Sequence, residues 1–345
     1  MIKDLKERNL TIKFAKPLSK NVYISLNKDS KLDIITDDLE TYFKIDNDYF
    51  DFHLNLKIEE KYSNLNQHIY DLIKFSRKFR ITHEKSFPKI SIFLNPELLS
   101  SGLIQCIKSL DNYCPHITLE VVINESYITN KIDYFTKEIL GLIGDDLNVI
   151  FIYYISKDFE KCEEMYKKAI ETANIYKNND AISVIFDVFP GINMQDAEID
   201  KMLTFLPRLK NTNTILFLDC GLMSIIYKFI LNYQYMQHNS NTYSFQCGLL
   251  NNNIVPNENI KVCPYFNYDN SSIKRCFSCE FLDYCSGCLI NPKNSICNFR
   301  LLFDNLLKKL KSTDIKLEDF TSPMPNKIEI RTSDWDYLVD SFDKL

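Results

Sequence analysis

The sequence has few glycines and lacks the common phosphate-binding patterns. Only seven glycines occur among 345 residues, and none follow the GxGxxG or GxxxxGK spacing, in which a glycine-rich loop binds phosphate. The formal net charge is −5, and the lysines and arginines are spread among acidic residues. A phosphate backbone needs a clustered basic surface. We therefore expect neither a classical nucleotide-binding enzyme nor a nucleic-acid-binding protein.

Long hydrophobic runs are also missing. The first residues, MIKDLKERNLTIKF, contain no apolar stretch of signal-peptide length. The longest apolar runs, such as Val149 to Ile155, have the length of a strand rather than that of a membrane span. The hydrophobic content of 45% is enough to bury a full core. The sequence thus predicts a folded cytoplasmic protein with no membrane partner.

From about residue 65 to 218, helical periodicity alternates with short apolar runs, as successive βα units require. Runs rich in Ile, Val, Leu and aromatics predict buried strands of a parallel sheet at 89–94, 117–124, 147–155, 181–189 and 214–218. The clearest helix is predicted from Asp158 to Lys177. Its apolar stripe is formed by Phe159, Cys162, Tyr166, Ala169, Ala173 and Tyr176.

The two ends of the chain are less regular. Residues 1–60 read as short strands and turns, for example Asn21 to Leu26 and Phe50 to Lys57, with no motif and no assigned role. The run from Arg300 to Lys311 predicts one amphipathic helix. Cys162, Cys106 and Cys114 are interpreted as buried core thiols, because free cysteine packs like a small hydrophobe.

Cysteine is the residue type whose distribution is most informative. Seven of the eleven cysteines lie between residues 247 and 297, as Cys247-x15-Cys263, Cys276-x2-Cys279-x5-Cys285-x2-Cys288 and Cys297. Two thiolates separated by two residues can turn toward one metal ion or cluster. In a reducing compartment such clustering points to metal or redox chemistry before disulfides.

The residues leave the identity of the metal open. A structural zinc site uses four ligands, so Cys276, Cys279, Cys285 and either Cys288 or Cys297 could hold one zinc ion. Seven thiols also divide into four and three, which fits two iron–sulfur clusters, one of them with an open iron. Disulfides in a secreted protein are a third reading, which the missing export signal disfavours.

The spacing of this block resembles the SPASM domain, the C-terminal auxiliary-cluster module of radical SAM peptide maturases. The segment Ile254 to Cys263 is similar to the hairpin that precedes the second cysteine of that module, and Leu218-Asp219-Cys220-Gly221 resembles its upstream DCG element. The βα run resembles the partial barrel of these enzymes. The resemblance implies an α/β fold, a partial (β/α) barrel followed by a small cysteine-rich SPASM-like domain.

The same resemblance implies two [4Fe–4S] auxiliary clusters, with zinc as the alternative. Cys276, Cys279, Cys285 and Cys297 would hold one cluster, and Cys247, Cys263 and Cys288 the other. The CxxxCxxC motif that binds the catalytic cluster in radical SAM enzymes is absent. Phe93 to Leu99 stands where the family has its GGEP element. No S-adenosylmethionine is therefore expected, and the chain is similar to the CXXX repeat peptide maturase group.

These observations predict four regions: an N-terminal segment at 1–60, a partial barrel at 61–235, the SPASM-like domain at 236–311 and an extension at 312–345. The expected function is maturation of a ribosomally made peptide, by binding the precursor peptide or relaying electrons. A complete radical SAM enzyme is the expected second partner. The alternative is a zinc-stabilised peptide-binding scaffold. Asp219, at a predicted strand end, is the one candidate catalytic carboxylate, and Cys220 is an unassigned thiol.

Overall fold

The fold was analysed in a computed structural model of the whole chain. The structure describes residues 19–45, 51–83, 89–111, 117–127, 147–155, 158–179, 181–189 and 298–311, together with the short pieces 141, 197–198, 200–201, 215–216, 222 and 260–261.

The described residues alternate between strands and helices. The strands are β1 (Ser19–Leu26), β2 (Asp51–Ile58), β3 (Lys89–Leu94), β4 (Ile117–Asn124), β5 (Asn148–Ile155), β6 (Ile182–Val188), β7 (Ile215–Leu216) and β8 (Ile260–Lys261). The α-helices are α2 (Leu32–Ile45), α3 (Leu65–His83), α4 (Ser101–Asp111), α6 (Cys162–Ile175) and α11 (Asn298–Lys311). Short 3-10 helices are formed by Pro96–Leu98, Glu125–Tyr127 and Phe159–Lys161.

All eight described strands belong to one sheet in the order β7-β6-β5-β4-β3-β2-β1-β8. Strands β1 to β7 are parallel, and each strand from β2 to β7 pairs with its predecessor in the chain. A doubly wound sheet reverses its strand order at a switch point, and this sheet has no such reversal. The sequential order is that of a (β/α) barrel, which agrees with the α/β class predicted from the sequence.

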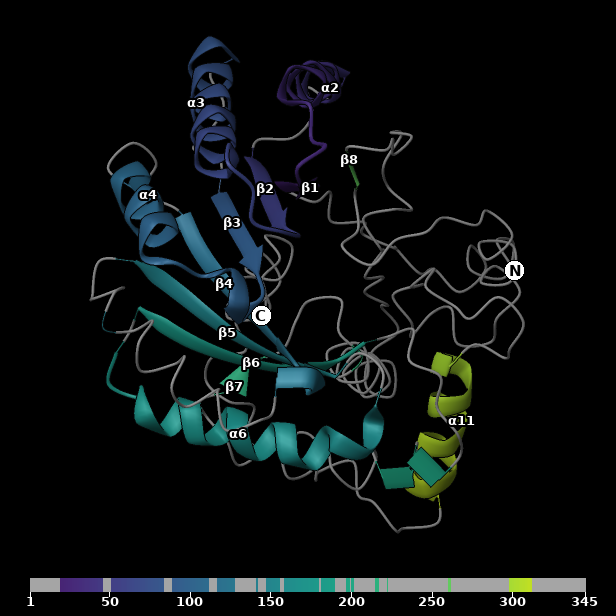
Figure 1. The fold of residues 1–345 in the computed structure, drawn as a ribbon. Coiled ribbons are helices and arrows are strands. Elements are labelled where there is room, and N and C mark those ends of the chain that lie inside the picture. The colour runs from purple at the N-terminus through teal and green to yellow at the C-terminus, as the bar shows by residue number, and fades with distance from the viewer. Residues whose placement is uncertain are drawn as a thin grey trace, which may run out of the picture.

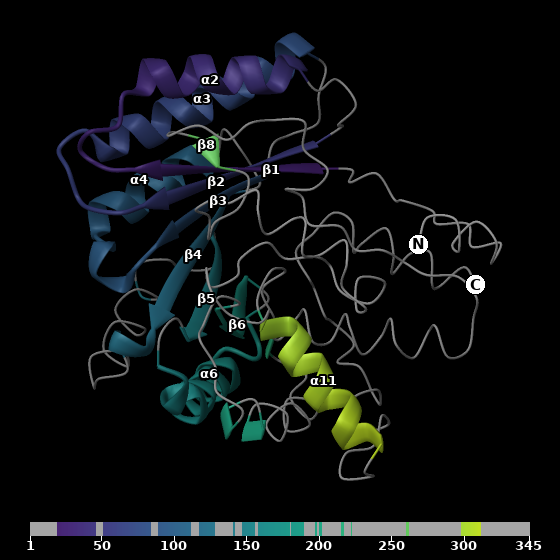
Figure 2. The ribbon, with the colours of Figure 1, turned by 90° about the vertical axis from the view of Figure 1, so that its right-hand side faces the viewer.

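The helices of the βα units cover one side of the sheet. The sheet curves, and α2, α3, α4 and α6 lie around its convex side (Figure 1). The same arrangement is seen from the side in Figure 2. The main core is formed between this side of the sheet and those helices, with fully buried residues such as Val22, Leu39, Ile69, Ile107 and Met165. Both one-sided helices and sequential strands are expected of a partial barrel.

The strands predicted from apolar runs are confirmed at β3, β4, β5 and β6. Their ends differ from the prediction by one residue at most. Strand β5 is buried at seven consecutive positions after Asn148, as a parallel strand covered on both faces requires. The predicted helix 158–177 consists of the 3-10 turn Phe159–Lys161 followed by α6, with Asp158 accepting a hydrogen bond from the N–H of Glu160.

The reading of residues 1–60 as short strands and turns is wrong for residues 32–45, which form helix α2. Its sequence contains Thr36, Thr41, Tyr42 and Phe43, residue types with lower helix propensity. The helix nevertheless buries Ile35 and Leu39 in the main core, so packing outweighs propensity. Strands β1 and β2 lie in the same sheet as β3, and the N-terminal segment therefore contributes the first two strands.

Two elements near the cysteine block belong to this fold. Strand β8 pairs antiparallel with β1, with Tyr23 opposite Lys261 and Ile24 opposite Ile260. Helix α11 confirms the amphipathic helix predicted from residue 300, and its Leu302, Phe303 and Leu306 are buried in the main core. In Figures 1 and 2, α11 lies toward the β6 and α6 end of the sheet. None of the described helices has the length and apolar composition of a membrane span.

Candidate functional site

Successive side chains of a strand point to opposite sides of a sheet, and the two sides differ here in chemistry. In β2, Leu54, Leu56 and Ile58 are buried in the main core; we call this helix-covered side the outer face. His53, Asn55 and Lys57 occupy the alternate positions, on what we call the inner face. The buried strand residues of the outer face are apolar, whereas the inner face also carries buried polar and ionisable residues.

The inner face has an apolar part and a polar part. A second apolar cluster lies on β5 and β6 and consists of Ile150, Ile152, Tyr154 and Ile185, with Phe93, Val122 and Phe189 packed against it. On β1 to β3 the equivalent positions are polar: Tyr23, Ser25, His53, Asn55, Lys57 and Ser91. Phe93 of β3 packs against the apolar cluster, whereas Ser91 of the same strand is polar. The boundary between the apolar and the polar part of the inner face therefore lies at β3.

Hydrogen bonds hold the polar part of the inner face together. The Nδ2 of Asn55 donates to the carbonyl oxygens of Val22 and His53, each at 3.3 Å. The His53 Nε2 and the Ser91 Oγ are 3.0 Å apart. A Ser–His contact can form a nucleophile and base pair, but Ser91 is 1% exposed and lies at the amino half of β3. This contact therefore stabilises the sheet rather than attacking a substrate.

Asn124, Tyr154 and Asp187 lie side by side at the carboxyl ends of β4, β5 and β6. Asn124 pairs in register with Tyr154, and Tyr154 with Asp187. Asp187 is fully buried and accepts a hydrogen bond from the N–H of Val188 at 2.7 Å. Tyr154 packs edge-on against Phe189, with ring centroids 6.4 Å apart. Carboxyl ends of parallel strands are where barrel enzymes place their reactive groups, so this row is a candidate site.

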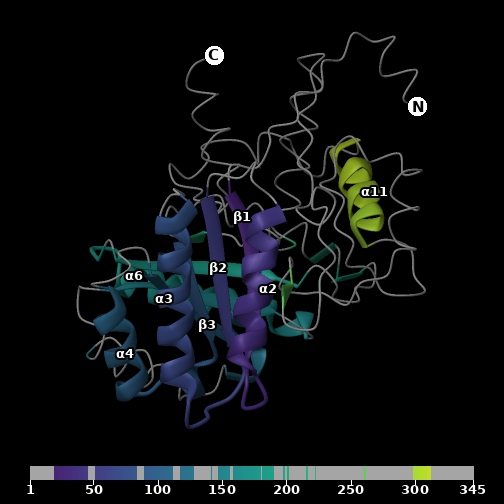
Figure 3. The ribbon, with the colours of Figure 1, turned by 90° about the horizontal axis from the view of Figure 1, so that it is seen from above.

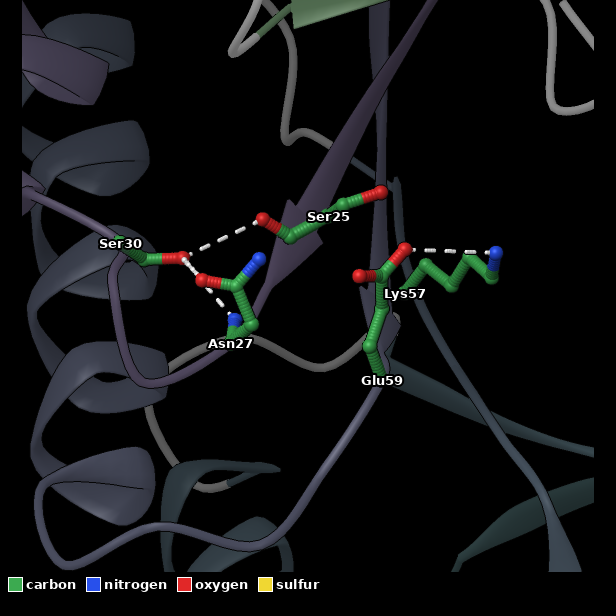
Figure 4. A network of polar contacts seen from close by, with 5 residues as sticks. All are labelled: Ser25, Asn27, Ser30, Lys57 and Glu59. Atoms are coloured by element: carbon green, nitrogen blue, oxygen red, sulfur yellow. Dashed lines mark hydrogen bonds and ion pairs between the residues drawn. The ribbon is translucent and has the colours of Figure 1, made fainter.

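The carboxyl ends of β1 and β2 carry a second polar network (Figure 4). The N–H of Asn27 donates to the Ser30 Oγ at 2.9 Å, and the Ser30 hydroxyl contacts the Ser25 carbonyl oxygen at 3.4 Å. On the next strand the Lys57 Nζ lies 3.5 Å from the Glu59 Oε1. Lys57 is exposed, with 59% of its side chain accessible, so this edge offers a cation to a bound molecule.

Carboxylates in the loops after the strands join neighbouring loops. Glu60 Oε1 accepts from the N–H of Lys28 at 2.9 Å, and Glu125 Oε1 accepts from the N–H of Asp158 at 3.1 Å. Burial raises the pKa of Tyr127, and the charge and hydrogen bond of Glu97 raise it further. These carboxylates fix the loops that surround the carboxyl edge.

Two of the thiols assigned to the core by sequence lie within the described residues. Cys162 is 5% exposed, and its pKa is raised to about 12 by burial, with smaller contributions from the charges of Asp187 and Glu163. Cys106 is half-buried between α4 and α3, with its Sγ 3.7 Å from the Asn66 carbonyl oxygen, and burial raises its pKa. Cys162 is thus the buried core thiol that the sequence predicts, whereas Cys106 is only partly buried and packs against the main core. Cys114 lies outside the described residues.

The predicted metal ligands lie outside the described residues: Cys247, Cys263, Cys276, Cys279, Cys285, Cys288 and Cys297. The same is true of Asp219 and Cys220. In the part of the chain that is described, no group of three or more His, Cys, Asp or Glu side chains is arranged to hold a metal ion. Lys261 of β8 precedes Cys263 by two residues, and Asn298 of α11 directly follows Cys297. Elements of the sheet domain therefore adjoin the cysteine block at both places.

The buried polar residues of the inner face, above all Glu120 and Asp187, were not predicted from the sequence; they are 3% and 0% exposed. Each is the single acidic residue of a largely apolar strand, in ITLEVVIN and ISVIFDV. A carboxylate is almost never fully buried unless it is paired. That isolated acidic residue was the available signal, and it marks the side of the strand that faces away from the helices.

The described fold defines an α/β protein whose parallel sheet is wound in one direction and covered by helices on one side. No family model matches the sequence, and no curated protein matches it significantly. The chain is similar to a solved structure of native anSMEcpe with bound AdoMet and Cp18Cys peptide. Sequence identity is 9%, the match covers 88% of this chain and 99% of that chain, and the TM-score is 0.45. A likeness of this size assigns neither family nor function.

Proposed function

We propose that this chain is an iron–sulfur protein of the SPASM type that acts in the maturation of a ribosomally made peptide, without a radical SAM cluster of its own. One observation supports the proposal above others. Seven cysteines crowd between residues 247 and 297, and the described elements β8 and α11, which adjoin Cys263 and Cys297, belong to the sheet domain. A cysteine block joined to a one-sided parallel sheet is the organisation expected of that family.

The donor set fits an iron–sulfur cluster chemically. Thiolates are soft ligands that favour Fe–S clusters and zinc, whereas Mg²⁺ and Ca²⁺ take oxygen ligands. Under the proposal, Cys276, Cys279, Cys285 and Cys297 hold one cluster, and Cys247, Cys263 and Cys288 hold the second. When bound, such clusters supply electron transfer or an open iron for a peptide thiolate.

The missing SAM-cluster motif motivates the second part of the proposal. The first cysteine of the chain is Cys106, well after the loop that follows β1 (residues 27–31) and the loop that follows β2 (residues 59–64). Neither loop can carry CxxxCxxC, whichever strand is counted as first. We therefore propose that a complete radical SAM enzyme is a partner and that this chain assists chemistry begun there.

The accessible part of the inner face is the proposed contact surface for the precursor peptide. Lys57 is exposed, while Tyr23, Phe93 and Asn124 are half-buried. Together they offer a cation, two aromatic rings and an amide, which suit peptide carbonyl groups and apolar side chains. Asp187 and Glu120 are too deeply buried to touch a peptide.

Region boundaries complete the proposal. We propose a sheet domain that ends near residue 235, a SPASM-like domain at 236–311 and a C-terminal extension at 312–345. Asp219 would lie at the carboxyl edge, since it follows Leu216 of β7 by three residues. An Asp219→Asn variant that retains peptide binding but loses peptide modification in the presence of the partner enzyme would identify it as a catalytic carboxylate.

Anaerobic purification followed by iron, sulfide and zinc analysis tests the metal assignment. Iron and acid-labile sulfide in proportion to two clusters, with visible absorption that bleaches on reduction, are expected. A colourless protein that takes up no iron on reconstitution would rule the proposal out. Stoichiometric zinc under the same conditions would instead establish the zinc-stabilised scaffold.

A matched pair of cysteine variants locates the metal. Cys279→Ser is expected to lose iron, because it removes a member of a CxxC pair. Cys106→Ser is the control, since Cys106 is a half-buried thiol of α4 outside the block, and it is expected to retain full iron content. Equal iron in both variants would show that the cysteine block is not the metal site.

A further inference from the structure

Helices α2 and α3 are neighbours with opposite charge. Helix α2 carries four carboxylates and one lysine, namely Asp33, Asp37, Asp38, Glu40 and Lys44. Helix α3 carries four cations and one carboxylate, namely Lys74, Arg77, Lys78, Arg80 and Asp71. Among these, Asp33, Asp37, Lys74, Arg77 and Lys78 are exposed. The outer layer of the protein therefore presents an acidic helix beside a basic one.

The same two helices expose large apolar side chains. Among the described residues, only Ile34, Tyr70 and Ile175 are large hydrophobic residues with exposed side chains, and Ile34 and Tyr70 lie on α2 and α3 at 41% and 38% exposure. The Lys74 Nζ lies over the Tyr70 ring, 5.9 Å from its centroid. Each helix thus combines an exposed apolar residue with charges of one sign one turn further along.

The spacing on the two helices matches. Asp37 and Asp38 follow Ile34 by three and four residues, and Lys74 follows Tyr70 by four, so both patterns repeat on one helix face. Both helices begin after neighbouring parallel strands and run in the same direction. They lie next to one another in a single layer, as the view from above shows (Figure 3).

From this arrangement we propose that the α2/α3 surface binds a second copy of the chain, so that α2 of each copy packs along α3 of the other. The two copies would be related by a two-fold axis that runs parallel to the helices, above the groove between them. This axis places the acidic α2 of each copy against the basic α3 of the other, and the facing helices run in the same direction. Such an interface is isologous, because the same surface serves both copies. Ile34 would then cover Tyr70, and Asp37 would face Lys74.

The size of the surface predicts a weak dimer. At 1.5 Å per residue the two helices are about 21 and 28 Å long, so together they cover less area than the roughly 800 Å² per partner of a standard stable interface. Complementary charge adds mainly to the association rate and to specificity. A dissociation constant in the micromolar range, weakening with added salt, is expected.

Sedimentation velocity of the full chain over a micromolar concentration series tests the proposal. The wild-type protein is expected to shift from monomer to dimer. Asp37→Lys or Lys74→Glu alone would place like charges opposite each other and weaken the dimer by about tenfold or more. The double variant Asp37→Lys/Lys74→Glu exchanges the two signs and restores dimerisation, because each copy supplies both partners.

Two further variants separate this surface from general charge effects. Lys167→Glu alters an exposed lysine of α6, 68% accessible and 3.5 Å from Glu163, and should leave dimerisation unchanged. Ile34→Ser should weaken the dimer without reversing any charge. A wild-type protein that stays monomeric at every concentration would overturn the proposal. So would a dimer indifferent to both single charge reversals, or one that the double variant fails to restore.

Discussion

The outer and inner faces of the sheet are made by the same strands, yet they follow different rules. On the outer face the buried strand residues are apolar and belong to the main core, together with residues of α2, α3, α4 and α6. On the inner face the apolar cluster of β5 and β6 gives way to polar residues on β1 to β3. One face supplies burial of apolar area, the main stabilising term in folding. The other carries buried polar groups, which cost stability unless they are hydrogen-bonded.

This difference indicates how the two faces divide stability and function. Polar residues that a protein buries at a cost are concentrated at functional sites, and here they lie on the face that no described βα-unit helix covers. Substitutions on the outer face should therefore change the free energy of unfolding most. Substitutions at accessible inner-face positions should change peptide binding and have a smaller effect on stability.

The largest loss of stability is expected at Phe186 on the outer face. Phe186 is fully buried, with its ring 5.5 Å from that of Tyr166. Phe186→Ala removes that packing and leaves a cavity, so it should lower the free energy of unfolding by about 3–5 kcal/mol in urea titrations. Ile175→Ala is the control at a site 66% exposed and should cost no more than about 0.5 kcal/mol. Similar losses of unfolding free energy in both variants would contradict the expectation that the buried outer face determines stability.

A smaller loss is expected at Asn55 on the inner face. Its amide satisfies the carbonyl oxygens of Val22 and His53, and Asn55→Ala would leave them buried without that donor. The expected cost is about 1–3 kcal/mol in the same urea titrations. Asn148→Ala alters an exposed asparagine of β5 on the same face and should be close to neutral. A neutral Asn55→Ala would mean that the buried polar groups of this face are not held by their hydrogen bonds.

The Cys162 thiol should make stability depend on pH in the alkaline range. The folded pKa is about 12, against 9.0 for an unperturbed thiol, so unfolding releases a proton above pH 9. Stability is therefore intact below pH 9 and falls as the pH rises toward 12. Between pH 8 and 10 the wild-type protein should lose about 1 kcal/mol more than Cys162→Ala. Parallel pH profiles would show that this thiol is not buried as described.

The smallest effect on stability is expected at Lys57, which is exposed and pairs with Glu59 at 3.5 Å. Lys57→Ala should change the free energy of unfolding by no more than about 0.5 kcal/mol. It should nevertheless weaken binding of a labelled precursor peptide in fluorescence anisotropy. Lys167→Ala on α6 is the matched control and should bind the peptide normally. Loss of stability without loss of peptide binding would reverse the roles assigned to the two faces.

Much of the sheet domain could be predicted from sequence, for a physical reason. A strand buried on both faces has a continuous run of apolar residues in its sequence, and β5 has such a run. Helix α6 is predicted by its apolar stripe, in which Cys162, Tyr166, Ala169 and Ala173 recur at three- and four-residue spacing. Helix α2 was missed because its helical state depends on burying Ile35 and Leu39 against the sheet. Such tertiary packing is not visible in local propensity.

The candidate site, too, could be predicted only in part from the sequence. Asp187 and Glu120 interrupt apolar strands and could have been noticed, but their common face follows only from the register of β4, β5 and β6. The pairing of β8 with β1 joins residues more than two hundred positions apart, which no local pattern encodes. The metal assignment remains a prediction from cysteine spacing, since those residues lie outside the described part of the chain.

The pairing of β8 with β1 also bears on how the protein is made. Because each strand from β2 to β7 pairs with the one synthesised just before it, the sheet can grow outward as the chain leaves the ribosome. Strand β1 forms first, but its β8 neighbour is translated late. During that interval Tyr23 and Ile24 offer open backbone groups, the kind of edge that recruits other chains. Slow translation of the segment before residue 260 would prolong this exposure, and chaperone demand should peak there.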